Sequence, residues 1–299
     1  MEPNQNMILT HLKQKEVISP PDWLPQNTVY LTIMGSEAYG TNLDTSDCDY
    51  YGVCIPPRRY IFPHIEGYIE GFSTNIPSFD QWLQHHIKDP DGKEKEYDFQ
   101  VFNIVKYFRL LMDNNPNVLD SLFTDRVCVH HTTSVGNLIR ENRHIFLHKG
   151  SYYKFIGYAH SQLNKMSSSE RTGKRKEVFD KYGFDLKFAM NLVRLALECE
   201  QILTLHDLDL RRDREYLKSI RRGDIKEQEI RDWFSSKEKF LEKCYQESTL
   251  PYGPDENKIR ELLLKCLEHH YGSLAKAITV PDQYKQIIQE ISKLCQKVI

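Results

Sequence analysis

The stretch GSEAYGTNLDTSDCDYYG, residues 35–52, decides what the first half of this chain is. The run VYLTIM at residues 29–34 precedes it, is apolar and rich in β-forming residues, and predicts a strand that ends at a Gly-Ser step. After ten intervening residues, Asp-x-Asp opens the segment at 47–55, in which polar and apolar residues alternate before the sequence becomes apolar. That pattern predicts a second, half-buried strand.

The residue types in this stretch suit phosphate chemistry. Side chains alternate along a strand, so Asp47 and Asp49 point to one face, about 7 Å apart. Two such carboxylates bind divalent cations through oxygen, and a pair of cations suits in-line phosphoryl transfer. Gly35 lets the backbone approach a phosphate, and Ser36 offers a hydroxyl and an N–H as donors.

A third carboxylate is expected on a neighbouring strand. The run YDFQVF at 97–102 predicts that strand and carries Asp98, a charge that is costly between aromatic residues unless it has a partner. We expect Asp98 to share the metal on the nucleophile side and to help take the proton from an attacking hydroxyl. The alternative is that Asp47 only caps a loop, because Gly-Ser and Asp-x-Asp are common in turns. The full order of strand, Gly-Ser, Asp-x-Asp and a later strand Asp is more specific and favours catalysis.

The rest of the chain predicts an α+β fold: a small mixed sheet with flanking helices, followed by an all-helical C-terminal domain. A polar turn at 89–96 precedes the third strand, and residues 72–76 are a candidate partner for it. A polar, basic loop is expected at 167–176. Helices are expected at residues 103–112, 152–166, 185–205, 226–247, 255–271 and 283–298. The change of pattern divides the chain into domains at 1–148 and 149–299.

Composition limits the classes of protein. The chain has 299 residues and a net charge of −2, which argues against wholesale, non-specific coating of nucleic acid. No stretch approaches the roughly 20 apolar residues of a membrane helix, and the N-terminus lacks the apolar core of a signal peptide. Seven scattered cysteines fit reduced thiols, so a cytoplasmic protein with no membrane association is expected. Adjacent histidines such as His85-His86 diverge on a strand or helix, which argues against a metal site there.

The motifs resemble a known superfamily. Gly35-Ser36, followed after ten residues by Asp47-Cys48-Asp49, resembles the motif of the DNA polymerase beta nucleotidyltransferases. The ordered blocks are similar to nucleotidyltransferases associated with RNA ligases and RNA repair in bacteria and phages, from about residue 29 to about residue 271. Those blocks are GSEAYGTN, SDCDYYG, Asp98 with FNIVKYFRLLMDNNPNVLDSLF, FIGYAHSQLNK and KFAMNLVRL.

The resemblance implies transfer of a nucleotidyl group from an NTP to an acceptor, with Mg²⁺ or Mn²⁺. It implies Asp47, Asp49 and Asp98 as metal ligands, and Gly35 and Ser36 as triphosphate contacts. It also implies that the first domain is catalytic and that the helical domain closes the nucleotide and acceptor cleft. RNA is the favoured acceptor and an RNA ligase a partner, both on the resemblance alone.

One helix carries further candidates. Lys187, Asn191 and Arg194 follow i, i+4, i+7 spacing, so they share a face of the helix at 185–205. A polar stripe on an otherwise apolar helix indicates a surface facing the cleft, where all three would bind nucleotide. For Arg194 the alternative is a buried ion pair with Glu198 or Asp185. Asn191 departs from the resemblance, since many relatives have His there, although Asn still donates hydrogen bonds.

Two other functions stay open. In one, the chain is a non-catalytic module of this fold that binds RNA or a partner. In the other, it is a signalling or toxin nucleotidyltransferase that uses the same site. The sequence specifies neither the NTP nor the acceptor, because fold does not determine function.

Overall fold

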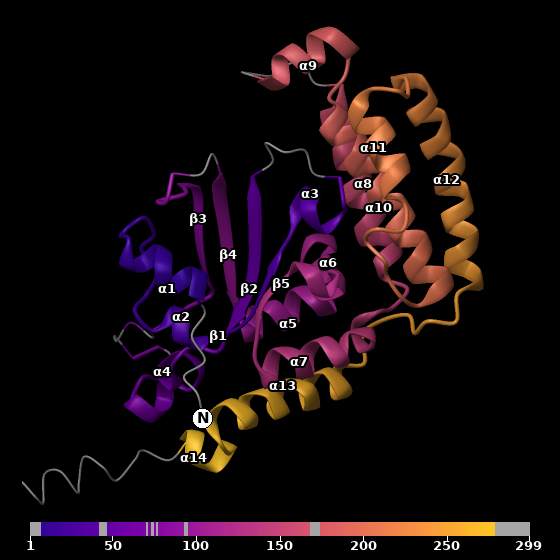
Figure 1. Cartoon of the computed structure of the whole chain (residues 1–299). Helices are drawn as coiled ribbons and strands as arrows, with labels where there is room; N and C mark the ends of the chain where they lie inside the picture. Colours follow the sequence, from indigo (N-terminus) through magenta and orange to yellow (C-terminus); the bar gives the residue numbers. More distant parts are fainter. Residues whose placement is uncertain are drawn as a thin grey trace, which may run out of the picture.

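The computed structural model describes residues 7–41, 47–69, 71–72, 75, 77–92, 95–167 and 174–278. In this part of the chain, five strands form one mixed sheet in the order β3-β4-β2-β1-β5 (Figure 1). β2 pairs parallel with β4, and the other neighbours pair antiparallel. The strands are β1 Thr28–Ile33, β2 Cys48–Cys54, β3 Gln81–Lys88, β4 Glu96–Asn103 and β5 Val129–Thr132. This confirms the predicted mixed sheet.

The strands predicted at 29–34, 47–55 and 97–102 are confirmed as β1, β2 and β4. In β2 the side chains alternate, so Cys48 and Tyr50 are buried while Asp49 is only partly buried on the other face. The register of the parallel pair sets Asp49 beside Asp98 of β4. On the buried face, the rings of Tyr50 and Phe99 stack with centroids 4.7 Å apart, which anchors this register.

The partner strand predicted at 72–76 is wrong: β4 pairs with β3 instead. Phe72 lies in a bend, and residues 73, 74 and 76 lie outside the described residues. The sequence of β3, QWLQHHIK, hides its period, because only Trp82 and Ile87 are buried and the spacing between them is odd. A register shift between Gln84 and Ile87, with His86 at a φ of 56°, explains that spacing as a β-bulge.

The helices predicted in the described part of the chain are confirmed, and four of the predicted first residues are N-caps: Asn103, Asp185, Lys226 and Asp255. Asn103 accepts a hydrogen bond from the backbone N–H of Val105, and Asp185 accepts from those of Lys187 and Phe188. The helices are α1 Met7–Gln14, α2 Leu24–Asn27, α3 Gly35–Ala38, α4 Arg58–Ile61, α5 Ile104–Met112, α6 Pro116–Phe123, α7 Ser134–Glu141, α8 Ser151–Met166, α9 Lys174–Tyr182, α10 Leu186–Leu205, α11 Arg214–Arg222, α12 Glu227–Glu247, α13 Glu256–Tyr271 and α14 Leu274–Ile278, with 3-10 turns η1 Pro63–Glu66, η2 Arg126–Cys128 and η3 Arg143–Phe146.

The predicted loop at 167–176 and the predicted helix at 283–298 are not confirmed over their whole lengths. The loop predicted at 167–176 is wrong at its end, because α9 begins at Lys174; residues 168–173 lie outside the described residues. The run there is polar and basic, so it lacks the apolar period that indicates a helix. The helix predicted at 283–298 also lies outside the described part of the chain.

Helix α10 is the centre of the helical layer. It packs against α8, α11 and α12 on several sides, which explains why its sequence is apolar on more than one face (Figure 1). Helix α13 returns to the sheet side, where it packs against α5 and α7. One core cluster contains residues from both halves of the chain, and the domain boundary at 148 stays a prediction. Among the described helices, none combines the length and apolar character that a membrane span requires.

Candidate active site

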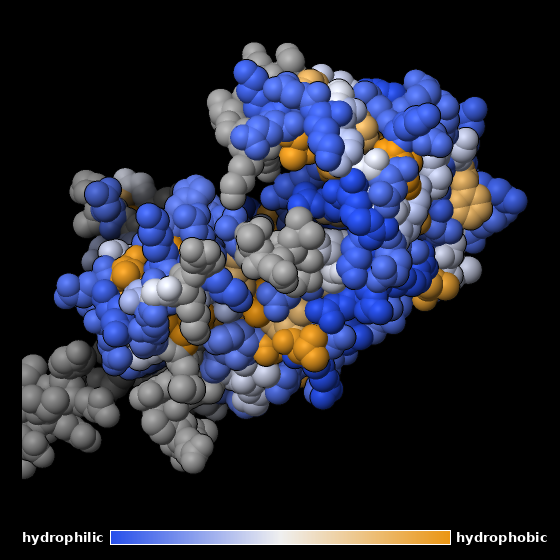
Figure 2. All heavy atoms as spheres, turned by 45° about the horizontal axis from the view of Figure 1, so that its top comes forward, coloured by the Kyte–Doolittle hydropathy of each residue, from blue (hydrophilic) through white to orange (hydrophobic). Residues whose placement is uncertain are grey.

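A cleft of about 690 Å³ lies between the sheet and α10. A space-filling view with the top of the molecule turned forward shows hydrophilic side chains around the hollow between the two layers (Figure 2). All the site residues predicted from the sequence line this cleft: Gly35, Ser36, Asp47, Asp49, Asp98, Lys187, Asn191 and Arg194. The volume is in the range of pockets that hold nucleotide-sized ligands.

The Gly-Ser turn leaves β1 and presses against the carboxylate of Asp49. The backbone N–H of Met34 donates to the carbonyl oxygen of Asp49 at 2.7 Å, which ties the end of β1 to β2. Gly35 has a φ of +64°, and a Cβ there would lie 2.1 Å from Oδ2 of Asp49. Only glycine combines that backbone angle with so close an approach. The turn therefore brings the Ser36 hydroxyl and the Asp49 carboxylate into one small volume.

The acidic residues affect one another. Burial raises the pKa of Asp49, and the charges of Asp98 and Asp47 raise it further, whereas Lys187 and His85 lower it. Asp47 is exposed immediately before β2. Three carboxylates that interact in a partly buried cleft repel one another, and a cation among them would relieve that repulsion.

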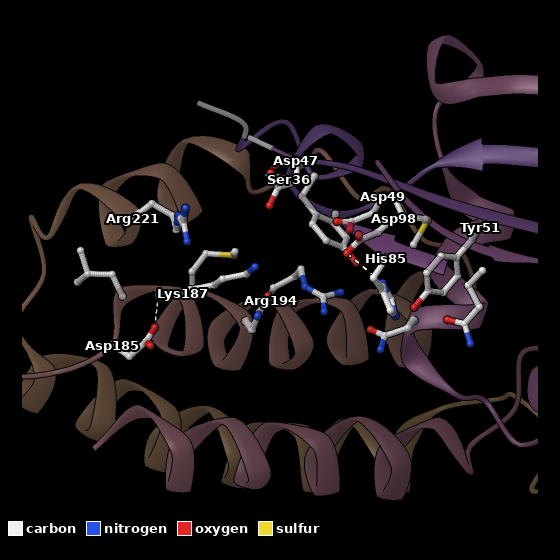
Figure 3. A pocket seen from close by; sticks show the side chains of 18 of the residues that line it. Ser36, Asp47, Asp49, Tyr51, His85, Asp98, Asp185, Lys187, Arg194 and Arg221 are labelled. Carbon is white, nitrogen blue, oxygen red and sulfur yellow. Dashed lines mark hydrogen bonds and ion pairs between the residues drawn. The ribbon is translucent and has the colours of Figure 1, made fainter. Parts of the chain in front are cut away.

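The carboxylate of Asp98 is held by the bulge in β3. The backbone N–H of His86 donates to Oδ1 at 2.8 Å, and Nδ1 of His85 lies 3.1 Å from Oδ2 (Figure 3). Bulges next to active sites commonly re-aim a side chain in this way. The sequence did not predict this contact, because β3 itself was not predicted; the available indication was a histidine pair shortly before the strand of Asp98.

The fit of a divalent cation can be tested on these side chains. Their chemistry fits, because Asp47, Asp49 and Asp98 supply the oxygen ligands that Mg²⁺ and Mn²⁺ prefer, and their charges interact. Within the described residues, no group of three or more His, Cys, Asp or Glu side chains is close enough together to hold a metal ion. The Asp98 carboxylate contacts His85 and the β3 backbone. The metal ligands therefore stay a prediction.

The opposite wall of the cleft is basic. Lys187 is exposed on the first turn of α10, close enough to Asp49 to lower its pKa. Asn191 is half-buried one turn further along the same face. Arg221 of α11 also lines the cleft, although the sequence analysis did not single it out. Figure 3 shows Lys187 and Arg221 on the helical side, facing the carboxylates of the sheet.

Arg194 has a different environment from Lys187. Its Nη1 lies 2.6 Å from Oδ2 of Asp120 and 2.8 Å from Oε2 of Glu198, and all three side chains are buried. Its guanidinium also lies 4.2 Å from the ring centroid of Tyr39, whose hydroxyl donates to Asp120. Of the two roles stated for Arg194, the structure shows the ion pair with Glu198; Asp185 instead caps α10. Arg194 also lines the cleft, and its contact with triphosphate stays a prediction.

This buried network contains two carboxyl groups and one guanidinium. Burial raises the pKa of Glu198 well above its usual range, although Arg194 opposes the shift. Burial also raises the pKa of Asp120. The network joins α10 and α6 to Tyr39, which follows α3, and so fixes the helical wall of the cleft relative to the Gly-Ser turn.

Comparisons with known proteins identify the family of the chain. Residues 1–262 match the model of the RNA repair pathway DNA polymerase beta family. An uncharacterized 38.9 kDa protein from the nrdC-mobD intergenic region of Enterobacteria phage T4 is 28% identical over 140 residues. That match covers 46% of this chain but only 38% of the phage protein. A solved nucleotidyltransferase-like protein from Exiguobacterium sibiricum is 11% identical, with a TM-score of 0.29 over 88% of this chain and 73% of that one.

Replacing Arg194 tests the buried network. We expect Arg194→Met to lower the free energy of unfolding by about 3–5 kcal/mol, because it leaves two buried carboxylates without their cation. Urea denaturation measures the change. The matched control is Lys187→Met on the exposed turn of the same helix, expected within about 0.5 kcal/mol of the parent chain. Equal stability of the two variants would contradict the structural role of Arg194.

Stability should depend on pH through Asp49. Its raised pKa means that folding favours the protonated form, so the ionised carboxyl costs stability above the raised pKa. Asp49→Asn should therefore raise the melting temperature at pH 7 in the presence of a chelator, and the gain should vanish below about pH 4, where aspartate is protonated in both states.

Asp207 supplies a control of opposite sign. Burial raises the pKa of Asp207, but hydrogen bonds from the Leu208 N–H and His144 bring it below its ordinary value. Asp207→Asn should therefore lose stability at pH 7. Scanning fluorimetry across pH measures both variants, and a gain for Asp49→Asn that grew as the pH fell would refute the assignment.

Proposed function

Because the chain belongs to the RNA repair pathway DNA polymerase beta family, we propose that it transfers a nucleoside monophosphate from an NTP to an acceptor. One observation carries the proposal: Asp47, Asp49 and Asp98 line one wall of a cleft whose opposite wall presents Lys187. A Gly-Ser turn lies against Asp49 in the same cleft. Carboxylates opposite a cation are the arrangement that phosphoryl transfer needs.

The proposed reaction forms one phosphorus–oxygen bond and breaks another. An oxygen of the acceptor attacks the α-phosphorus of the NTP, the bond from that phosphorus to the bridging oxygen of the β-phosphate breaks, and pyrophosphate leaves. The proton of the attacking hydroxyl passes to a carboxylate, for which we assign Asp98, because its two oxygens are already oriented by β3. Lys187 places a positive charge against the triphosphate, and Ser36 donates its hydroxyl to a phosphate oxygen.

We propose Mg²⁺ or Mn²⁺ as the cofactor, held by Asp47, Asp49 and Asp98. A cation bound there supplies charge neutralisation and lowers the pKa of the attacking hydroxyl. Its support is the oxygen chemistry of the three side chains and the repulsion that raises the pKa of Asp49.

We propose RNA as the acceptor and an RNA ligase as a partner, in the cytoplasm. The support is the description of the family, which names an RNA repair pathway. Two alternatives use the same cleft. A non-catalytic module would bind NTP or RNA without turnover, and a signalling or toxin enzyme would make free oligonucleotides or modify tRNA or protein. Incubation with each NTP, labelled at the α-phosphate, and total RNA separates the three by product.

Replacing Asp49 tests catalysis. We expect Asp49→Ala to abolish transfer of label from an α-labelled NTP to RNA, because the carboxylate nearest the Gly-Ser turn is lost. Its melting temperature should also no longer rise on addition of NTP with Mg²⁺ or Mn²⁺, whereas the parent chain gains stability by mass action. Asp232→Ala on α12 is the control, since that exposed carboxylate lies outside the cleft lining. Retained labelling in Asp49→Ala refutes the assignment; the absence of any metal-dependent shift in the parent chain favours the non-catalytic module.

Replacing His85 tests the orientation of Asp98. We expect His85→Ala to lower kcat about 10- to 100-fold, the usual effect of losing the residue that orients a ligand, with little change in the KM for NTP. His85→Asn should restore part of the rate, because the amide nitrogen of Asn can occupy the position of Nδ1 and donate to Oδ2. Steady-state rates on the same RNA measure both variants. An unchanged kcat in His85→Ala would show that the contact at 3.1 Å has no such role.

A further inference from the structure

The segment around α11 is a basic part of a chain that is slightly acidic overall. Residues 211–224, RRDREYLKSIRRGD, carry six cationic and three acidic side chains, a net charge of +3, against −2 for the whole chain. Arg214, Lys218 and Arg221 have i, i+4, i+7 spacing and share one face of α11. Leu217 and Ile220 are buried on the adjacent flank of the helix. We call Arg214, Lys218 and Arg221 the α11 stripe.

The α11 stripe meets the cleft at one end. Arg221 lines the cleft beside Lys187 (Figure 3). At the other end, Arg214 lies against Gly40, just beyond α3, where a Cβ would be 3.4 Å from Cδ of Arg214. At 1.5 Å per residue, the stripe is about 10 Å long. It therefore forms a basic border that leads along the rim into the proposed site.

A half-buried arginine holds this border in place. Nε and Nη2 of Arg211, in the turn before α11, donate to the carbonyl oxygens of Ala38 and Glu37 at 3.2 and 3.0 Å. Those carbonyls belong to α3, whose first residues are the Gly-Ser turn. The α11 stripe is thus positioned relative to the atoms proposed to grip phosphate.

The α11 stripe keeps an excess of positive charge. Nε of Arg214 and Nζ of Lys218 lie 3.5 and 3.1 Å from the same oxygen of Glu215, whose side chain is 72% exposed. Exposed ion pairs contribute little to stability. Replacing the shared, solvated Glu215 carboxylate by a phosphate therefore costs these two cations little free energy. Such a row fits a ligand with repeated negative charge.

We propose that the α11 stripe binds the phosphate backbone of a single-stranded RNA acceptor and guides its end into the cleft. This inference rests on the proposed function and specifies where its acceptor lies. An NTP in the cleft would reach Lys187 and Arg221 but not the whole 10 Å row. A cleft of about 690 Å³ admits a single strand's terminal nucleotide rather than a duplex. Backbone contacts carry no sequence information, so binding should not depend on sequence.

Salt-dependent binding of the full chain to a fluorescent, unstructured RNA strand tests the proposal. The variant is Arg214→Ala with Lys218→Ala, which suits an exposed helix face because Ala is the best helix former. Loss of two phosphate contacts should lower the slope of log affinity against log salt concentration by about 1.4 and weaken binding of unrelated sequences equally.

A matched control exists on α12. Lys239→Ala with Lys243→Ala likewise removes two cationic side chains one turn apart, of which Lys243 pairs with Glu247 at 3.6 Å. The control should keep the affinity and slope of the parent chain. The inference is overturned if the stripe variant binds like the control, or if the parent chain does not bind RNA at low salt.

The two proposals fail separately. Arg214 and Lys218 do not line the cleft, so the stripe variant should keep the rise in melting temperature with NTP and metal that Asp49→Ala loses. A preserved NTP response with unchanged RNA binding overturns the α11 stripe alone. Loss of the NTP response in the parent chain, with RNA binding still weakened in the stripe variant, overturns the proposed chemistry but supports the RNA surface.

Discussion

The parallel register of β2 and β4 is the constraint on which the candidate site depends. It sets Asp49 beside Asp98, although burial and like charge both disfavour two ionised carboxyls there. The sheet enforces the pairing from its other face, where Tyr50 stacks on Phe99. A pair that costs stability and is held rigidly is characteristic of functional sites, because selection for function tolerates local destabilisation.

One buried network fixes the two walls of the cleft relative to each other. Arg194 of α10 pairs with Asp120 of α6 and lies over Tyr39, which follows the Gly-Ser turn. Arg211 makes a second link, from the turn before α11 to the carbonyls of α3. The helical layer therefore does more than cover one side of the cleft. It sets how far its basic side chains lie from the carboxylates, and that separation determines the electrostatics of the cleft.

Sequence patterns succeeded where the structure is local and regular. The apolar runs of β1, β2 and β4, and the long helices α8, α10, α12 and α13, follow from period and caps alone. The sequence patterns failed at β3, where a bulge breaks the alternation, and at α9, whose residues are mostly polar. The contact of His85 with Asp98 was lost with β3, because register across a sheet is not encoded in either strand separately.

The sequence by itself determined the residue types and their spacing: a Gly-Ser turn after a strand, Asp-x-Asp at the head of the next, and a polar face on an apolar helix. These features depend on near neighbours along the chain, so periodicity reveals them. Only the tertiary structure decided which of those groups are buried in pairs and which are exposed in the cleft. It buried Arg194 between two carboxylates, left Lys187 exposed in the cleft, and brought Arg221 beside it. Burial and pairing depend on segments distant in the chain, which a pattern within one segment does not record.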